Sequence, residues 1–357
     1  MNEDSLDINK IIEMITPRIS SYLLNQRNEK LMNIIIEKRI MRAFSTVIFL
    51  KIELERNKAL YFVVKIIKHN WINKKIVESE NQAVVEYNIL KELYPKFKSI
   101  PGCSVPEPIF VIPDIELYCM YFVNGNLLMN NFRYTRFFSS QKEFNLLKKN
   151  MYQCGLWLRE FHHFTGPKLE SAEKSFDSIM ERAEHRLTLI ESVRSNNIPI
   201  DFKNHAMRLF NEQINELQGS KIIISGRHGD FTPLNMISDY EGITVFDFLG
   251  YQKDPIAVDL FKILLFLENE RLSISSSKKR VHEIKKSFLS GYSKLPNIPT
   301  QVSTICEGMQ RVVSLWGHLS NKKNHFHHKI ESKRIISENL KWFYNNERKS
   351  LLYESQE

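Results

Sequence analysis

Residues 225–260, SGRHGDFTPLNMISDYEGITVFDFLGYQKDPIAVDL, carry three polar side chains at a spacing that predicts both fold and chemistry. Asp230 closes the triplet HGD, Asn235 follows it by five residues, and Asp247 follows it by seventeen. Phosphoryl transfer from Mg·ATP requires a carboxylate that takes the proton of the attacking hydroxyl. It also requires an amide and a second carboxylate that hold the metal. The pattern therefore favours a kinase of small molecules.

The sequence around this motif predicts a strand, a tight loop and a hairpin. Residues 222–224 are an apolar, β-branched run typical of a buried strand, and the glycines and proline that follow indicate a loop with Asp230 at its turn. A hairpin over residues 236–246 would place Asn235 and Asp247 at its ends, where their oxygens could ligate Mg²⁺. The alternative is an ordinary hairpin without function, because Asp, Asn and Gly are common in turns.

The stretches HGDFTPLN, VFDFLG and DPIAVDL resemble motifs of the aminoglycoside phosphotransferase and choline kinase family. This family has a two-lobed, protein-kinase-like fold of the α+β class. The resemblance implies a small N-terminal lobe at residues 1–123, with an antiparallel sheet that binds the nucleotide and ends in the hinge. It implies a large, mainly helical lobe at residues 124–357 that carries the catalytic residues and binds the acceptor.

The resemblance also implies a role for each polar residue of these motifs. Asp230 would be the catalytic base, and Asn235 and Asp247 would be the Mg²⁺ ligands. His228 would support the catalytic loop, and Asp259 would brace that loop through hydrogen bonds to its backbone.

Two features of the same region disfavour a protein kinase. Protein kinases carry Arg at the position of Gly229 in this chain. Only six residues separate Asp247 from Asp254, which leaves no room for the long activation segment that docks a peptide substrate. Assays on protein acceptors would test this alternative.

The upstream half contains the lysine and glutamate that a kinase fold requires. Strands are predicted at 33–40, 46–53 and 59–67, and Lys65 lies inside the third, where an unpaired charge would be costly to bury. The resemblance pairs Lys65 with Glu86, on a predicted helix, so that the lysine is aimed at the α- and β-phosphates. The alternative is a surface lysine and an unrelated glutamate. Lys68 is the nearest rival, but three residues further along it would turn to the opposite strand face.

Other nucleotide contacts rest on the resemblance alone. Ser45 and its neighbouring N–H groups would contact the β-phosphate, although their turn lacks the glycine that would allow close approach of the backbone. In the predicted hinge YCMYFVNG, Met120 would stand behind the adenine, while the Tyr121 carbonyl and the Val123 N–H would form hydrogen bonds with it. An ordinary hairpin explains the hinge residues equally well.

The composition of the 357 residues, 43% hydrophobic and 25% charged, is ordinary for a globular protein of one large or two smaller domains. No apolar run is long enough to span a membrane, and the polar N-terminus does not resemble a signal peptide. The four cysteines have no CxxC spacing, so neither a zinc site nor a disulfide framework is expected. These features predict a cytoplasmic protein.

Beyond the hinge the pattern is mainly helical, and the charge is basic. Helices are predicted at 146–163, in 174–218 with a break near 196–199, at 254–267, at 281–295 and in 299–353, where they would build the acceptor pocket. The net charge is +9, and residues 320–350 carry eight Lys and Arg against three acids. A solvated helix face explains this run, but so does an anionic acceptor or weak association with anionic lipid. The run disfavours a polycationic aminoglycoside acceptor, and no motif supports nucleic-acid binding.

We therefore predict an ATP- and Mg²⁺-dependent phosphotransferase that phosphorylates a hydroxyl of a small molecule, with a sugar or a glycolipid-related compound as candidate acceptor. The alternative is a catalytically inactive, nucleotide-binding regulatory pseudokinase, which the glycine-free turn at Ser45 would suit. The sequence does not predict the acceptor itself, the choice between ATP and GTP, or the oligomeric state.

Overall fold

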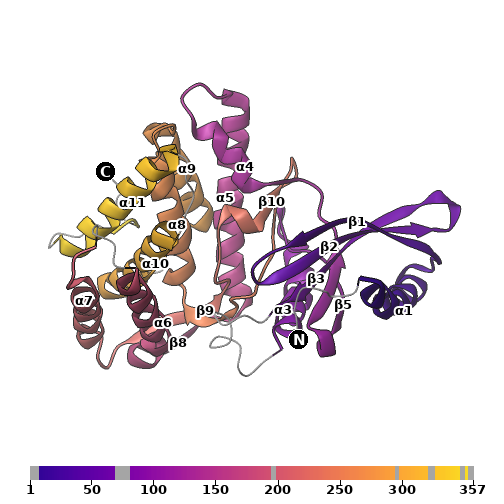
Figure 1. Cartoon of the computed structure of the whole chain (residues 1–357), viewed down its shortest axis with the longest axis horizontal. Helices are drawn as coiled ribbons and strands as arrows, with labels where there is room; N and C mark the ends of the chain where they lie inside the picture. Colours follow the sequence, from indigo (N-terminus) through magenta and orange to yellow (C-terminus); the bar gives the residue numbers. More distant parts are fainter. Residues whose placement is uncertain are drawn as a thin grey trace. The chain divides into compact units, whose positions relative to one another are not determined.

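The computed structural model describes residues 8–68, 81–193, 198–293, 297–320, 326–345 and 350–352. The chain forms two compact units, and Figure 1 labels many of their helices and strands. Unit 1 comprises Met1–Ile100, Ser104–Gly125 and Thr244–Leu249. Unit 2 comprises Pro101–Cys103, Asn126–Ile243 and Gly250–Glu357. The predicted α+β class is confirmed, because unit 1 contains an antiparallel sheet and unit 2 is mainly helical.

Unit 1 is built on a five-stranded sheet with strand order β1-β2-β3-β6-β5, in which every neighbouring pair is antiparallel. The three strands predicted near its start lie within the observed ones. The strands are β1 (Leu31–Met41), β2 (Ser45–Leu54), β3 (Ala59–Ile67), β5 (Pro108–Ile112) and β6 (Leu117–Tyr121). Short 3-10 turns follow β2 and β5, at Glu55–Asn57 and Pro113–Ile115.

One face of this sheet is covered by the helix α1 (Ile8–Arg27), to which the sequence analysis assigned no structure. Ile11, Ile15, Ile19 and Leu23 recur every four residues, which places them on one side of the helix. They form a buried cluster with alternate residues of the strands, including Phe62 of β3. Because strand side chains alternate between faces, Lys65 points to the opposite side of the sheet from Phe62.

The other helix of unit 1 is α3 (Gln82–Phe97), which contacts β3, β5 and β6. It begins after Asn81, whose side chain accepts a hydrogen bond from the Val84 N–H at 3.1 Å and so caps the first turn. Ile89, Leu90 and Leu93 are buried, as the predicted helical spacing requires. The first turns of α3 therefore present Glu86 to the strands.

Unit 2 contains most of the helices, and two of them, α5 and α9, pack against each other at glycines. The helices α5 and α9 approach so closely that a Cβ at Gly155 would lie 2.0 Å from the Phe288 carbonyl oxygen, and one at Gly291 would lie 1.9 Å from that of Tyr152. The helices are α4 (Leu128–Asn131), α5 (Gln141–Phe164), α6 (Ala172–Ser192), α7 (Phe202–Glu216), α8 (Ala257–Leu272), α9 (Lys278–Tyr292), α10 (Thr300–Ser320) and α11 (Phe326–Tyr344).

Two small groups of strands complete unit 2. The strands β8 (Lys168–Ser171), β9 (Lys221–Arg227) and β12 (Gln252–Pro255) form an antiparallel sheet in the order β12-β9-β8. The strands β7 (Asn126–Leu127) and β10 (Met236–Ser238) also pair antiparallel. The remaining short strands, β4 (Cys103–Ser104) and β11 (Ile243–Val245), lie where the chain passes from one unit to the other.

The helix predicted at 254–267 begins later than expected, at Ala257. Residues Gln252–Pro255 pair with β9 instead, and the buried Asp254 carboxylate accepts from Arg227 at 2.6 Å and from Arg182 at 2.9 Å. These two ion pairs fix Asp254 in the strand, so the proline after it ends a strand rather than starting a helix.

The helical range predicted at 299–353 contains α10 and α11, while residues 321–325, 346–349 and 353 lie outside the described residues. Four of the eight Lys and Arg of the basic run therefore receive no structural account. They are Lys322, Lys323, Arg348 and Lys349. No helix in the described ranges combines the length and the apolar character needed to cross a membrane.

Candidate active site

Lys65 lies at the centre of a polar cluster in unit 1. Its Nζ is 2.8 and 2.9 Å from the two carboxylate oxygens of Glu86, and 2.8 Å from Oδ1 of Asp247. Tyr118 stands opposite Lys65 in the β3–β6 register, and its hydroxyl donates to Glu86 Oε2 at 2.8 Å. The structure thus brings together the lysine and glutamate that the sequence analysis paired, with Tyr118 as an additional partner.

The charges of this cluster keep the lysine protonated. Burial alone would lower the pKa of Lys65, but the nearby carboxylates of Asp247 and Glu86 more than offset that effect and hold the pKa above its ordinary value. Glu86 is fully buried and also accepts from the Phe248 N–H at 3.2 Å. A buried carboxylate with several donors is a rigid partner, so Lys65 presents a fixed positive charge.

Asp247 follows β11 and takes up a left-handed backbone conformation, with φ of 72°. Such a conformation costs a non-glycine residue roughly 1–2 kcal/mol and persists only where the surroundings impose it. Here the Asp247 carboxylate is bonded to Lys65, and the next N–H, of Phe248, is bonded to Glu86. The two contacts hold the strained residue in place at the end of the predicted hairpin strand.

The predicted adenine-binding residues lie at the end of β6 in the same sheet, or just after it. Met120 pairs with Val63 and faces the same side as Tyr118, whereas the Tyr121 ring packs against Phe62 on the α1 side, with centroids 4.9 Å apart. The Tyr121 N–H is bonded to the Glu107 carbonyl at 2.9 Å. Within the described parts of the chain, no group accepts from the Val123 N–H, so this donor is available to a ligand.

Ser45 begins β2 rather than standing in an open turn. It pairs with Ile67, its side chain is buried, and its carbonyl accepts from the Arg42 N–H at 2.8 Å. Lys68, the rival to Lys65, lies just beyond β3, where its N–H donates to the Phe44 carbonyl at 2.9 Å. The turn between β1 and β2 is therefore closed by backbone bonds, without glycine.

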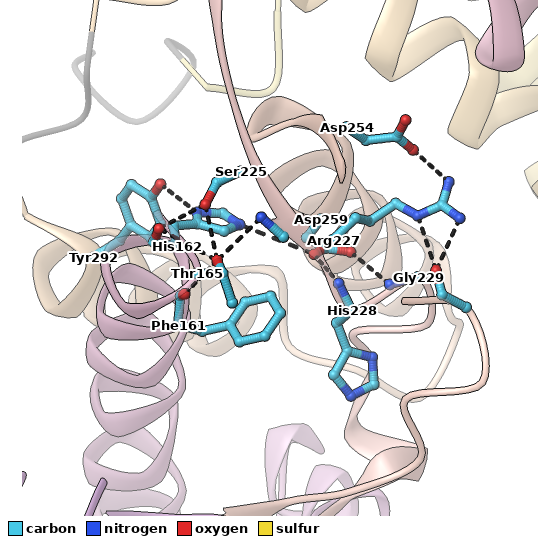
Figure 2. A network of polar contacts seen from close by, with 12 residues as sticks. Phe161, His162, Thr165, Ser225, Arg227, His228, Gly229, Asp254, Asp259 and Tyr292 are labelled. Carbon is cyan, nitrogen blue, oxygen red and sulfur yellow. Dashed lines mark hydrogen bonds and ion pairs between the residues drawn. The ribbon is translucent and has the colours of Figure 1, made fainter. Parts of the chain in front are cut away.

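In unit 2, Asp259 holds the HGD loop through the backbone. The buried carboxylate, in the first turn of α8, accepts from the His228 N–H at 2.7 Å and from the Gly229 N–H at 3.2 Å (Figure 2). Burial alone would raise the pKa of Asp259, but His162, His228 and the backbone donors hold it below its ordinary value. An ionised Asp259 thus fixes the two residues that precede Asp230.

His162, which the sequence analysis did not single out, contacts the other side of Asp259. Its Nε2 lies 3.9 Å from Asp259 Oδ2, and its Nδ1 lies 2.9 Å from the Tyr292 hydroxyl. Figure 2 shows His162 together with both partners. His162 is buried near the end of α5, and its carbonyl accepts from the Ser225 hydroxyl at 2.6 Å. The brace of the loop therefore extends from α8 to α5 and α9.

The Asp230 carboxylate is held at both oxygens. The amide nitrogen of Asn235, at the end of the 3-10 turn Pro233–Asn235, donates to Oδ2 at 2.8 Å. The ammonium of Lys262, on α8, lies 3.1 Å from Oδ1. The Asp230 side chain nevertheless remains 56% exposed, so it is fixed in orientation and still open to a ligand.

Gly229 can only be glycine in this loop. Its φ is 91°, and a Cβ there would lie 2.7 Å from the Cα and carbonyl oxygen of Gly250. Arg227 donates to that same Gly250 carbonyl at 2.9 Å, which holds the two backbone segments together. The arginine that protein kinases carry at this position would not fit here.

Comparisons with known proteins agree with this geometry at the level of the fold. No protein-family model matches the sequence, and no curated protein matches it either. Solved structures do match. A putative aminoglycoside phosphotransferase from Ralstonia eutropha JMP134 superposes with a TM-score of 0.58 and 12% identity, over 91% of this chain and 98% of that chain.

Two further structures give the same result. The amicoumacin kinase hAmiN superposes with a TM-score of 0.55 and 14% identity, over 92% of this chain and 96% of its own. Choline kinase LicA from Streptococcus pneumoniae gives a TM-score of 0.51 and 12% identity, over 93% and 99%. This chain has the aminoglycoside phosphotransferase and choline kinase fold. The fold that the sequence motifs implied is thereby confirmed.

Asn235 and Asp247, which the sequence analysis assigned to Mg²⁺, have side chains with oxygen atoms that can bind this ion. Asp247 and Asn235 offer a carboxylate and an amide oxygen, and the Asn235 amide nitrogen, not its oxygen, is bonded to Asp230. In the described residues there is no group of three or more His, Cys, Asp or Glu side chains that could hold a metal by themselves. Mg²⁺ commonly needs only one or two protein ligands, because waters and substrate phosphates complete its shell.

The sequence analysis did not identify three residues that contact the predicted site residues in the structure. For two of them, the sequence contains a pattern that could have indicated the contact. Lys262 is a single charge within the apolar helix segment FKILLFL, three residues after Asp259 and thus on the same helix face. Tyr118 is two residues from Met120 on one strand and so shares its face. His162 had no comparable signal, because a histidine at the end of an amphipathic helix is usually a surface residue.

Proposed function

We propose that this chain is an ATP- and Mg²⁺-dependent kinase that transfers the γ-phosphoryl group to a hydroxyl of a small molecule. The observation that carries the proposal is the buried ammonium of Lys65, bonded at once to Glu86 and Asp247. A lysine held protonated beside a carboxylate suits the binding of nucleotide phosphates. Nucleotide use is also supported by two similar structures, since the amicoumacin kinase contains AMP-PNP and a glucosamine kinase contains ADP.

In the proposed reaction, Asp230 orients the acceptor hydroxyl and receives its proton. The hydroxyl oxygen forms the new bond to the γ-phosphorus as the bond to the β-phosphate oxygen breaks. Asn235 and Lys262 keep the Asp230 carboxylate in one orientation, and Lys65 offsets charge on the α- and β-phosphates. Bound Mg²⁺, for which Asn235 and Asp247 are the proposed ligands, supplies further charge neutralisation.

Met120, Tyr121 and Val123 are the proposed adenine contacts, and Ser45 a proposed phosphate contact. Val123 has the best support, because its N–H is available to an acceptor. Ser45 has the weakest, because its side chain is buried and its carbonyl is engaged with Arg42. We therefore expect the phosphates to be held mainly by Lys65.

The acceptor is proposed only as a class. The similar structures are named for kinases of different acceptors, among them choline, amicoumacin and glucosamine, so the fold alone does not select one. The net charge of +9 favours a sugar or glycolipid-related acceptor with anionic groups over a polycation. A cytoplasmic location, where ATP is available, remains a prediction from the sequence.

The test is phosphate transfer from γ-labelled ATP with Mg²⁺ into fractionated small molecules and lipids. Wild type is compared with Asp230→Asn and with Asp177→Asn, an exposed aspartate on α6 that serves as the matched control. A labelled product made by wild type and Asp177→Asn, but not by Asp230→Asn, is the expected result. Equal labelling by all three proteins would overturn the role of Asp230.

A regulatory pseudokinase is the second candidate, and the glycine-free turn between β1 and β2 favours it. It predicts ATP binding by calorimetry without a labelled product from any fraction. In that case Lys65→Met should abolish binding, whereas Asp230→Asn should leave it unchanged.

A further inference from the structure

Two large aromatic side chains project into solvent from the loop between α4 and α5. The segment begins with the 3-10 turn Phe132–Thr135, and it ends at the N-terminus of α5 (Figure 1). Phe137 is 61% exposed, and Phe138 is fully exposed. Ile274, in the neighbouring loop between α8 and α9, is 53% exposed. We refer to Phe137, Phe138 and Ile274 as the apolar tip.

The two loops that carry the apolar tip are bonded to each other. Arg136 forms a β-bridge with Ser276, and the Ser277 N–H donates to the Thr135 carbonyl at 2.9 Å. Arg280 donates to the carbonyl oxygens of Tyr134 at 2.9 Å and Ser139 at 3.2 Å. The phenylalanines are therefore exposed on an ordered support, which reduces the entropy lost when they bind a partner.

The surroundings of the apolar tip are strongly basic. Residues 126–142 and 273–282 contain six Lys and Arg and no Asp or Glu. Glu143 and Glu283 directly follow these two ranges, and Glu283 is paired with Lys148 at 3.1 Å. Glu331 accepts from Ser273 at 2.7 Å, and Glu270 is close enough to act on Arg136. The six basic residues are Arg133, Arg136, Lys142, Lys278, Lys279 and Arg280. All of them except Arg280 are exposed.

We propose that the apolar tip and these basic residues form a docking surface for an anionic membrane. Aromatic side chains enter the boundary between headgroups and acyl chains, and Lys and Arg around them attract acidic headgroups. The apolar tip projects outward, so a protein partner would need a matching pocket, whereas a fluid lipid surface adapts to its shape. This inference does not rest on the proposed kinase activity, and it concerns residues other than the basic run at 320–350.

Flotation with vesicles tests the surface on the full chain. Wild type should bind vesicles of phosphatidylcholine mixed with phosphatidylglycerol, bind phosphatidylcholine alone much more weakly, and dissociate as salt is raised. Phe137→Ser with Phe138→Ser should weaken binding by about tenfold for each side chain. Lys278→Gln with Lys279→Gln should weaken it by about fivefold for each charge. Ile200→Ser, at an exposed isoleucine followed by Asp201, is the matched control and should bind like wild type.

A fluorescent probe on residue 138 then locates the contact. The four native cysteines are buried, so Phe138→Cys can be labelled selectively with a polarity-sensitive dye. A blue shift with anionic vesicles is expected. The proposal fails if wild type does not float with anionic vesicles, if the double serine variant floats as well as wild type, or if the probe shows no shift when the chain is bound. An acidic protein partner would be indicated if only such a partner shifted the probe.

Discussion

Lys262 places its ammonium 3.1 Å from Oδ1 of Asp230, the proposed catalytic base. It lies on α8 almost one turn after Asp259, whose carboxylate accepts from the His228 and Gly229 N–H groups. The helix α8 therefore fixes the loop in two ways: Asp259 binds the backbone of the loop, and Lys262 binds the Asp230 side chain. We infer that Lys262 is a positioning residue that acts through Asp230.

Replacing Lys262 with Met should lower kcat for phosphoryl transfer by about 10- to 100-fold, because Asp230 loses the partner that orients its carboxylate. The Kd for ATP should stay close to the wild-type value, and Lys262→Arg should restore much of the rate. Lys148→Met is the matched control, because Lys148 forms an ion pair with Glu283 at the same distance of 3.1 Å. A wild-type kcat for Lys262→Met would contradict the positioning role.

Removing the charge of Lys65 should destabilise the protein as well as abolish nucleotide binding. Lys65→Met leaves Glu86 buried without its counter-ion, and such changes typically cost about 3–5 kcal/mol. Urea denaturation would measure this loss in the free energy of unfolding. The additional change Glu86→Gln should recover part of the stability but none of the activity. Lys51→Met breaks the more exposed Lys51–Glu53 pair on the same sheet and should lower the free energy of unfolding much less than Lys65→Met does.

Alanine substitutions at Gly229 and Gly166 should separate two effects on the free energy of unfolding, that of a close contact and that of a left-handed backbone conformation. Both have positive φ, but a Cβ at Gly166 would meet nothing within 4 Å, whereas one at Gly229 would meet Gly250 at 2.7 Å. Gly166→Ala should cost about 1 kcal/mol, from the left-handed conformation alone. Gly229→Ala should cost about 2–4 kcal/mol, because backbone must also move. Equal unfolding free energies for the two variants would show that the approach of Gly250 is relaxed in solution.

Glu270 should make stability fall as pH rises towards neutrality. Burial, reinforced by the charge of Glu331 and opposed by Arg136, raises the pKa of Glu270 to about 7. Between about pH 4.5 and about pH 7 the folded state binds the proton that the unfolded chain has released, so the free energy of unfolding decreases across this window. Glu270→Gln removes this dependence.

The free energy of unfolding of Glu270→Gln, relative to that of wild type, should rise by on the order of 2 kcal/mol from the acidic to the neutral end of that window. Urea denaturation at a series of pH values measures the difference. Glu212→Gln, at an exposed position on α7, serves as the control and should follow wild type at every pH. Parallel curves for wild type and Glu270→Gln would refute the prediction.

The sequence predicted most elements because their signals are local. The apolar run of β3 and the helical spacing around Glu86 indicated a strand and a helix, and both are observed. The same reasoning failed at Asp254, where propensity favoured a helix start and two arginines hold a strand instead. It also gave no structure to α1, whose apolar stripe of one residue in four is diluted by polar neighbours.

For this protein, the amino-acid sequence determined the order of its elements and the spacing of Asp230, Asn235 and Asp247. Turn chemistry and side-chain periodicity depend on residues a few positions apart, so they can be followed along the chain. Only the tertiary structure showed that Lys262 reaches Asp230 and that His162 lies beside Asp259. Those contacts depend on how helices distant in sequence pack, and a lysine or histidine on a helix carries no mark of the carboxylate it will meet.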